Sequence, residues 1–347
     1  MKTTSAYASN TGFRPRIGAA CVYLEPDGTR SREKNFAGTT VKALTAMSEL
    51  QKTKWLTTLL SHNLDALDQQ IEAIAALPKQ LRMWRLSADM TPIPTHSVTR
   101  KFYGNTFVRQ LIESRLAATG DRARSAGIRL SFHPGQYVVL GSLSKDVREN
   151  ALRELRMHAR LFDMMGYKDR HQDGCAVNVH VGPKVAAVGA MRLLIIDNPD
   201  IARFLTLEND EFSWSARSIV DNFGDLVPVV LDIHHYWIMH ERRLRPYSPL
   251  VAEIRETWHG QLPKIHHALS APELLCQSAR QDRLIPMKPL LAAGIRKAAL
   301  RVHSLSPWHR WSNSYAAEFA SDIMWEGKDK NLGAMAIYKQ LYKSPKT

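Results

Sequence analysis

Residue types that bind metal ions recur where short apolar runs of the chain end. A lone histidine at such a point is usually a hydrogen-bonded structural residue, but a carboxylate that ends an apolar run needs a partner for its charge. The side chains concerned are His133, His180, Glu208, Asp232, His235, His266 and Glu326. If they converge on one point they need cations among them, because like charges in a small space repel one another. The set therefore predicts a metal centre.

The ligand types narrow the choice of metal and of chemistry. Mixed imidazole and carboxylate ligands suit Zn²⁺, Mn²⁺ or Fe²⁺ better than Ca²⁺ or a thiolate-bound metal. The set is too large for one ion, so we expect two or three ions bridged by a carboxylate. Such clusters clamp the attacking and leaving oxygens of a phosphodiester displacement. The residues alone predict a metal-dependent phosphodiesterase, with a metal-dependent sugar isomerase or an amidohydrolase as alternatives.

These side chains converge only if regular elements bring them together. Short apolar runs that end in polar or breaker residues predict strands at 16–24, 81–87, 128–134, 175–182, 204–210, 227–235, 262–270 and 321–330. Helical spacing of apolar residues is found between them at 54–77, 104–127, 144–167 and 211–225, with Ser144 as an expected N-cap. The alternation predicts an α/β fold, a closed TIM (β/α)₈ barrel with the metal cluster at the C-terminal face of its strands. An open doubly wound sheet is the alternative.

Length and composition are those of a globular protein of one large domain or two ordinary ones. The 347 residues are 44% hydrophobic and 23% charged, and no apolar run of about 18 residues predicts a membrane span. We expect a disordered tail at 1–15, without a secretory signal, and a single barrel domain at 16–347. The cysteines, Cys21, Cys175 and Cys276, form neither a disulfide framework nor a zinc signature, so a cytoplasmic location is expected.

A formal charge of +14 favours a polyanionic partner, with a basic protein that lacks one as the alternative. The stretch 271–300 interrupts the alternation of strands and helices, and we interpret it as an insertion. Its cationic side chains either contact phosphates or form a solvated helix surface. They are Arg280, Arg283, Lys288, Arg296 and Lys297.

Eight sequence blocks carry a family resemblance. They are "NLDAL" (63–67), "WRLSADMTPI" (84–93), "RLSFHPGQYVVL" (129–140), "NVHVG" (178–182), "LTLEND" (205–210), "VPVVLDIHH" (227–235), "KIH" (264–266) and "DIMWEGKDK" (322–330). On these blocks, from about Arg16 to Lys330, the chain resembles the UV damage endonuclease family, which is similar in fold and metal site to endonuclease IV. The H-P-G-Q-Y and E-x-K-D-K blocks, in this order, are specific to that family.

The resemblance implies a TIM barrel with a cluster of two or three ions, usually manganese, with zinc, cobalt or magnesium as alternatives. The implied ligands of a first ion are His133, His180 and Glu208. Those of a second ion are Glu208, Asp232, His266 and Glu326. A third ion would take His235 and a later histidine, His303, with His309 as the alternative. Lys264 matches a family lysine that is carboxylated near the metals, with a plain salt bridge as the alternative; Lys264, Glu208 and Glu326 are the implied catalytic residues.

The partner implied by the resemblance is double-stranded damaged DNA, cut by a monomer at the phosphodiester 5′ to the lesion. In a bacterium such a protein would be nucleoid-associated. Gln136 and Tyr137 would enter the duplex at the lesion and replace lost stacking. From the residues alone, a turn with a half-buried tyrosine is the alternative.

Ala19 and Tyr23 stand where family members often carry a tyrosine and an asparagine, so the lesion range stays open. Gly327 and Asn331 also depart from the usual final block. A sugar-phosphate isomerase-like barrel acting on a small molecule, and a DNA-binding module with a degraded cluster, remain rival hypotheses.

Overall fold

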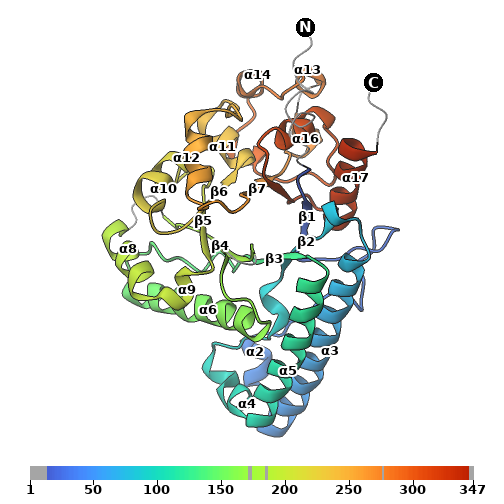
Figure 1. Ribbon diagram of the computed structural model, residues 1–347, viewed down its shortest axis with the longest axis vertical. Helices are drawn as coiled ribbons and strands as arrows, with labels where there is room; N and C mark the ends of the chain where they lie inside the picture. The colour runs from blue at the N-terminus through green and yellow to red at the C-terminus, as the bar shows by residue number, and fades with distance from the viewer. Residues whose placement is uncertain (1–13, 171–173, 184–186, 276, 344–347) are drawn as a thin grey trace.

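A computed structural model describes residues 14–170, 174–183, 187–275 and 277–343, and its centre is a closed barrel of parallel strands (Figure 1). The strands are β1 Ile17–Ala20, β2 Met83–Leu86, β3 Arg129–Phe132, β4 Ala176–His180, β5 Leu205–Glu208, β6 Val229–Asp232, β7 Lys264–His267 and β8 Asp322–Trp325. Each strand pairs with its neighbours in the chain, and β8 closes on β1. The predicted TIM barrel is confirmed, and the open doubly wound sheet is wrong. Cys276 and residues 1–13 of the expected tail lie outside the described residues.

Helices and short 3₁₀ turns connect the strands. They are α2 Val41–Thr45, α3 Glu49–Ala75, η1 Lys79–Leu81, η2 Ala88–Met90, η3 Ser97–Thr99, α4 Arg100–Gly104, α5 Thr106–Ser125, α6 Lys145–Met164, α8 Val188–Asp197, α9 Pro199–Ala202, α10 Ala216–Phe223, α11 Ile233–His240, α12 Pro249–Glu256, η4 Pro272–Leu274, α13 Gln277–Gln281, α14 Met287–Ala292, α15 Lys297–Leu300, α16 Arg310–Ala317 and α17 Lys330–Tyr342. The four predicted helices correspond to α3, α5, α6 and α10. Ser144 precedes α6 as expected, but its side chain makes no capping hydrogen bond.

The strands are shorter than the apolar runs that predicted them, because polar residues at their ends turn the chain early. Asp232 is the clearest case. Its Oδ1 accepts hydrogen bonds from the backbone N–H groups of His234 and His235, both at 2.7 Å, and so caps α11. The predicted strand 227–235 was therefore too long: His235 lies in the first turn of a helix.

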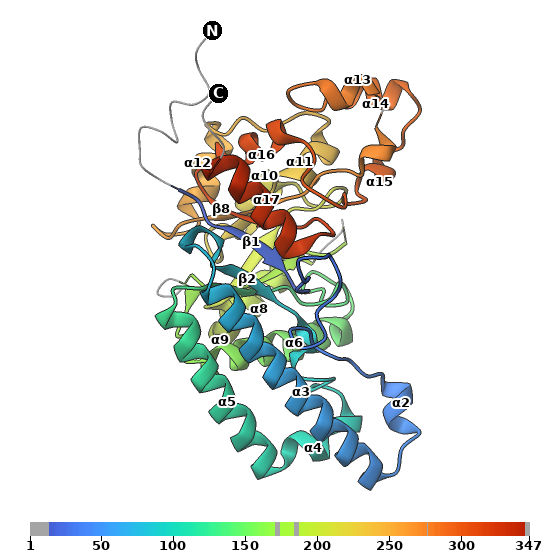
Figure 2. The same cartoon turned by 90° about the vertical axis from the view of Figure 1, so that its right-hand side faces the viewer.

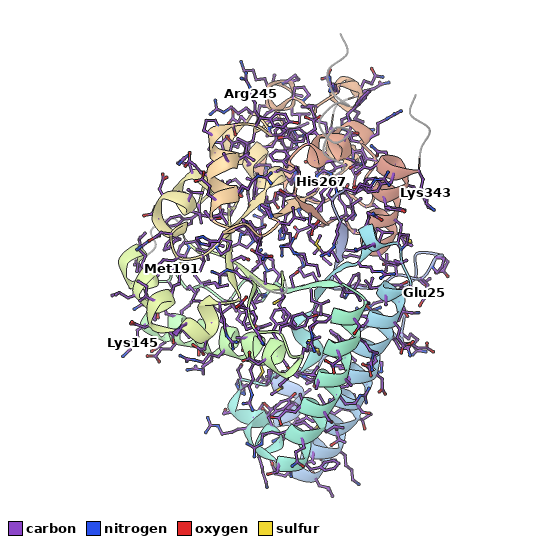
Figure 3. All side chains as sticks on the ribbon, viewed as in Figure 1. Glu25, Lys145, Met191, Arg245, His267 and Lys343 are labelled. Atoms are coloured by element: carbon purple, nitrogen blue, oxygen red, sulfur yellow. The ribbon has the colours of Figure 1, made fainter. Side chains whose placement is uncertain are left out.

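The hydrophobic core lies between the outer face of the barrel and the helices that surround it. Phe132 of β3 packs edge-on against Phe162 of α6, with 4.9 Å between ring centroids, and Phe162 lies 5.3 Å from Phe204. Each such ring contributes about 1.5–3 kcal/mol through burial. Side chains fill the space around the strands, including the labelled His267 (Figure 3). Within the described residues, no helix is both long and apolar enough to cross a membrane.

Two groups of helices extend beyond the barrel wall (Figure 2). The long helices α3 and α5 lie side by side, joined by Arg115, whose Nη2 lies 2.7 Å from Asp65 Oδ1 and 2.8 Å from Asp68 Oδ2. They carry α2 and α4 at their far end, at the bottom of Figure 1. The second group, α13 to α15, belongs to the stretch 271–300, between β7 and β8. Its status as an insertion stays a prediction.

Candidate metal centre

The predicted ligands meet at the C-terminal end of the barrel because parallel strands point their carboxyl ends the same way. His180, Glu208 and Asp232 are the last residues of β4, β5 and β6. His133 and Glu326 follow directly after β3 and β8, and His266 lies inside β7. The strand register sets His180 beside Glu208, and Asp232 beside His266.

Glu208 stands between two groups of ligand atoms. In one group, atoms of His133, His180 and Glu208 lie within 4.8 Å of one another; in the other, atoms of Glu208, Asp232 and His266 do so. One carboxylate oxygen, Oε2, is 3.4 Å from His133 Nε2, and the other, Oε1, is 2.9 Å from His266 Nδ1. Glu208 is therefore placed to bridge two cations.

Glu326 and His235 extend this cluster. His266 Nδ1 lies 3.2 Å from Glu326 Oε1. His235 Nδ1 lies 3.6 Å from Asp232 Oδ2, and its Nε2 is 3.7 Å from Glu211 Oε2. Burial opposes a charge on this ring, but the carboxylates around it raise the pKa of His235 to about 9. Without a metal the ring carries a proton, which a cation bound there must displace.

The two candidates for the later histidine ligand, His303 and His309, have different surroundings. His303 is half-buried; its Nδ1 lies 3.0 Å from the carbonyl oxygen of Glu326, and its ring is 5.7 Å from that of His234. His309 is buried, and both of its ring nitrogens are engaged, at 2.8 Å with Ser312 Oγ and at 2.9 Å with the carbonyl oxygen of Asp282. Because both nitrogens of His309 are engaged, it is the weaker candidate, and His303 as the ligand of a third ion stays a prediction.

Several atoms of the cluster are buried without a hydrogen-bond partner among the described residues. They are Asp232 Oδ2, His180 Nδ1 and His266 Nε2. A buried carboxylate oxygen without a donor is costly, and burial raises the pKa of Asp232. Burial also opposes the charge of Glu208, but His266 and His180 beside it hold its pKa well below the usual range. An imidazole and carboxylate set with unpaired atoms fits divalent transition-metal ions.

Lys264, the first residue of β7, lies below this cluster in the barrel. Its side chain is buried, and Nζ has neither a hydrogen-bond partner nor an ion pair within the described part of the chain. The alternative of a plain salt bridge is therefore wrong. Burial, followed by the nearby cations Arg129 and Arg85, lowers the pKa of Lys264 to about 7. Much of this amine is uncharged at neutral pH.

Three further polar residues hold the cluster in place and were missed from the sequence. Arg85 of β2 donates to Glu326 Oε1, and Asn178 of β4 donates to Glu208 Oε2. Asn209 exchanges two hydrogen bonds with the backbone of Asp232, at 2.9 and 3.0 Å. The available signal was a polar residue inside an apolar run, as in "LRMWRLS" and "CAVNVHVG". Such residues orient metal ligands in many sites.

Gln136 and Tyr137 are exposed at the same end of the barrel, four residues or fewer after His133. Tyr137 is 64% exposed, which excludes the half-buried tyrosine considered as an alternative. Its ring lies against Gly135, where a Cβ would stand 2.5 Å from Tyr137 Cε1. The exposed ring of Tyr137 would have to turn aside if residue 135 carried a side chain.

The positions that depart from the family pattern are part of the packed wall. Ala19 is buried in β1. Tyr23 is half-buried, with its ring 6.1 Å from that of Trp84 and the ammonium of Lys34 5.2 Å from its centroid. These contacts favour a core tyrosine over a stacking group at the mouth.

The cationic side chains of 271–300 differ in their surroundings. Lys297 Nζ lies 3.2 Å from Glu241 Oε1, and Arg283 stacks 5.7 Å from the ring centroid of Trp311. Arg280 donates to the carbonyl oxygen of Leu275 at 3.0 Å. Phosphate contacts by this stretch stay a prediction.

Comparisons with known proteins bear on the family of this chain and on its fold. A family model described as UV-endonuclease UvdE matches residues 15–344. A UV DNA damage endonuclease from Nostoc sp. is 28% identical over 281 residues, covering 80% of this chain and 82% of that protein. The UV DNA damage endonuclease of Deinococcus radiodurans is 28% identical over 292 residues, covering 81% and 89%.

Two solved structures share the fold. The crystal structure of SacUVDE has a TM-score of 0.73 and 22% sequence identity, and the match covers 95% of this chain and 99% of that one. Endonuclease IV from Thermus thermophilus has a TM-score of 0.52 and 12% identity, covering 95% and 100%. At these identities the likeness establishes the barrel and its topology.

Proposed function

The chain belongs to the UV-endonuclease UvdE family, and from this premise we propose that it is a DNA-repair endonuclease that hydrolyses the phosphodiester 5′ to a lesion in duplex DNA. The observation that carries the chemistry is the pair of ligand groups that share the buried Glu208. Two adjacent cation sites joined by one carboxylate are the arrangement that phosphodiester hydrolysis uses.

The residues would divide among two or three ions, which we expect to be manganese. Those of the first are His133, His180 and Glu208, those of the second Glu208, Asp232, His266 and Glu326, and those of the third His235 and His303. When bound, such ions supply Lewis acidity toward the phosphate oxygens and lower the pKa of bound water. Glu208 holds the two main sites together, while Arg85 fixes the carboxylate of Glu326.

We propose that Lys264 is carboxylated. Its pKa of about 7 leaves much of the amine uncharged, and its Nζ has no competing partner. From its uncharged form, the nitrogen would form a bond to the carbon of CO₂ and release one proton, which converts a buried neutral amine into an anion close to Glu208 and Glu326. Arg129 and Arg85, whose positive charges disfavour the ammonium form, would favour the resulting carbamate.

The lesion would be opened by Gln136 and Tyr137. Their exposure at the metal end of the barrel supports this role, since an aromatic ring there can replace the stacking of a displaced base. A damaged step stacks weakly and costs less to open, which gives selectivity without reading the base. The excess of positive charge serves the phosphate backbone.

End-labelled duplexes provide the test. The protein with Mn²⁺ is incubated with duplexes that carry a cyclobutane dimer, a 6-4 photoproduct, an abasic site or no damage. We expect cutting 5′ to the lesion and little cutting of intact DNA. Binding without cutting, or indifference to DNA, would contradict the proposal and favour the DNA-binding module or the isomerase.

Variants separate the chemistry from lesion recognition. His180→Ala and Glu208→Gln are expected to lose cutting while they retain DNA binding. Tyr137→Ala is expected to reduce the preference for damaged over intact duplex by about tenfold, since stacking of one base contributes about 1–3 kcal/mol. Full cutting by either ligand variant, or an unchanged preference in Tyr137→Ala, would remove that residue from its assigned role.

A further inference from the structure

The far end of the paired helices α3 and α5 carries charges that the metal centre does not use. We call this end the basic tip: residues 38–58, with α2 and the start of α3, and 92–112, with α4 and the start of α5. Its charged side chains are Lys42, Lys52, Lys54, Arg100, Lys101 and Arg109, against the single carboxylate of Glu49. Such an excess on a small surface is a footprint for a polyanion.

The cations of the tip differ in their pairing from the cations of α3 and α5 nearer the barrel, a part of these helices that we call the shaft. On the shaft, Arg115 pairs with Asp65 and Asp68, and Arg122 pairs with Asp68. At the tip, only Lys52 has a carboxylate partner, Glu49 at 2.7 Å. The other five cations are exposed, and none forms an ion pair within the described residues.

The tip is a packed structure, so its charges are held in place. Leu44 of α2, Leu56 of α3 and Phe102 of α4 are buried and belong to the main apolar core. Tyr103 Oη donates to the carbonyl oxygen of Pro92 at 2.9 Å. Outward-facing apolar side chains lie among the cations, with Phe107 72% and Trp55 44% exposed.

The tip projects on the same side as the metal centre. Asn63 of α3 marks the level of the barrel mouth, because its Nδ2 donates to the carbonyl oxygens of Ala37 and Asp89, which follow β1 and β2. Helix α3 begins 14 residues earlier, at Glu49, which corresponds to a rise of about 21 Å. Figure 2 shows α2 and α4 at this remote end.

This distance indicates which part of a bound DNA duplex the tip would contact. Duplex DNA carries one phosphate per about 3.4 Å along each strand, so a duplex arm that runs alongside α3 covers this 21 Å with roughly six base pairs. We propose that the basic tip binds the phosphate backbone of one duplex arm, about six or more base pairs from the lesion held at the mouth. This inference rests on the proposed function, since duplex DNA is its substrate.

The test compares charge reversal at the tip with charge reversal elsewhere. The tip variant is K54E/K101E. The matched control is K79E/K343E, whose two lysines are exposed and lie on η1 and after α17, away from the tip; Lys343 is labelled in Figure 3. Both variants change the net charge equally. Each is measured with a lesion duplex that has twenty base pairs on both sides, and with two duplexes shortened to five base pairs on one side.

We expect the tip variant to bind the long duplex about tenfold more weakly than the wild type and the control, with the slope of log K against log salt reduced by about two. For the wild type, shortening one particular side should cause a similar loss, and for the tip variant it should cause none. Equal binding of the long duplex by all three proteins, or equal losses in tip variant and control, would overturn the proposal. Wild-type cutting next to the lesion in any of these duplexes supports the nuclease function separately, whatever the tip variant does.

Discussion

The two ends of the barrel bury charged groups in opposite ways. At the N-terminal end, Asp322 Oδ1 accepts a hydrogen bond from the backbone N–H of Arg16 at 2.8 Å, and its Oδ2 accepts one from Arg129 Nη1 at 2.9 Å. Arg129 also donates to the carbonyl oxygen of Gly174 at 2.9 Å. At the C-terminal end, Asp232 Oδ2, His180 Nδ1 and His266 Nε2 are buried without a hydrogen bond among the described residues, and the ring of His235 lies 3.6 Å from Asp232 Oδ2.

The difference separates a structural ion pair from a binding site. A buried charge whose partners all come from the chain contributes to the folded state alone, and breaking it is strongly destabilising. A buried carboxylate oxygen without a hydrogen-bond donor is tolerated where a bound cation compensates its charge. In barrels of this class, reactive groups lie at the C-terminal face and stabilising ones at the other.

The largest effect is expected for Asp232→Asn, which keeps the cap of α11 but removes the charge. We expect cutting to fall by on the order of 100-fold or more, since a metal ligand weakens. Wild-type protein should be stabilised by Mn²⁺, by about 2.7 kcal/mol at a hundredfold excess over Kd, and the variant much less. Thermal unfolding with Mn²⁺ and with a chelator measures this.

In Asp232→Asn, the loss of cutting and the loss of stabilisation by Mn²⁺ must occur together. Without metal, the variant loses the desolvation cost of the Asp232 charge together with its attraction to the protonated ring of His235, 3.6 Å away, so its stability should change less than that of Asp322→Asn. An Mn²⁺-induced shift equal to that of the wild type would exclude Asp232 as a ligand and would weaken the contrast between the two ends.

A smaller effect, on stability rather than on activity, is expected for Asp322→Asn. It leaves the guanidinium of Arg129 buried without its counter-charge, which should lower the free energy of unfolding by about 3 kcal/mol. The cutting rate of the folded protein should stay within about threefold of the wild type. Urea unfolding and initial rates check the two parts.

The double variant Asp322→Asn/Arg129→Met serves as the control for stability. Because it removes both charges, it should recover part of the loss seen in the single variant. If Asp322→Asn unfolded like the wild type but cut poorly, the N-terminal end would belong to the active site and the comparison would be wrong.

The smallest effect concerns His158 of α6, a buried histidine that is not among the proposed metal ligands and whose Nδ1 lies 2.7 Å from the carbonyl oxygen of Glu154. Its Nε2 has no partner among the described residues, and its ring packs edge-on against Phe132. Burial lowers the pKa of His158 to about 4. The unfolded chain therefore binds a proton first, so the stability is fully present above the ordinary pKa of about 6.5 and is lost as the pH falls toward 4.

Between pH 7 and pH 5 this residue should cost about 2 kcal/mol of unfolding free energy. His158→Gln should show a shallower pH dependence by that amount, measured by urea unfolding at both pH values. Substitution of the exposed His96 by Gln is the matched control and should leave the slope unchanged. If the two variants behaved alike, the unpaired nitrogen of His158 would have no bearing on acid stability.

The order of strands and most of the proposed ligands were readable from the sequence. Apolar runs that end in His133, His180, Glu208 and Asp232 are a local pattern, and parallel strands of one barrel bring their ends together. The family blocks added Lys264, the later histidine His303, and the pair Gln136 and Tyr137. These inferences needed only short-range periodicity and residue type.

Tertiary structure alone decided how the buried groups are satisfied. Strand ends do not reveal that Arg85 holds Glu326, that Lys264 lacks a partner, or that His235 belongs to a helix. The basic tip joins Lys42 to Arg109 across two helices and a strand, so no window of sequence contains it. Hydrogen-bond partners and surface charge depend on distances between elements, which are set when the barrel closes and the helices pack, whereas periodicity reports only neighbours along the chain.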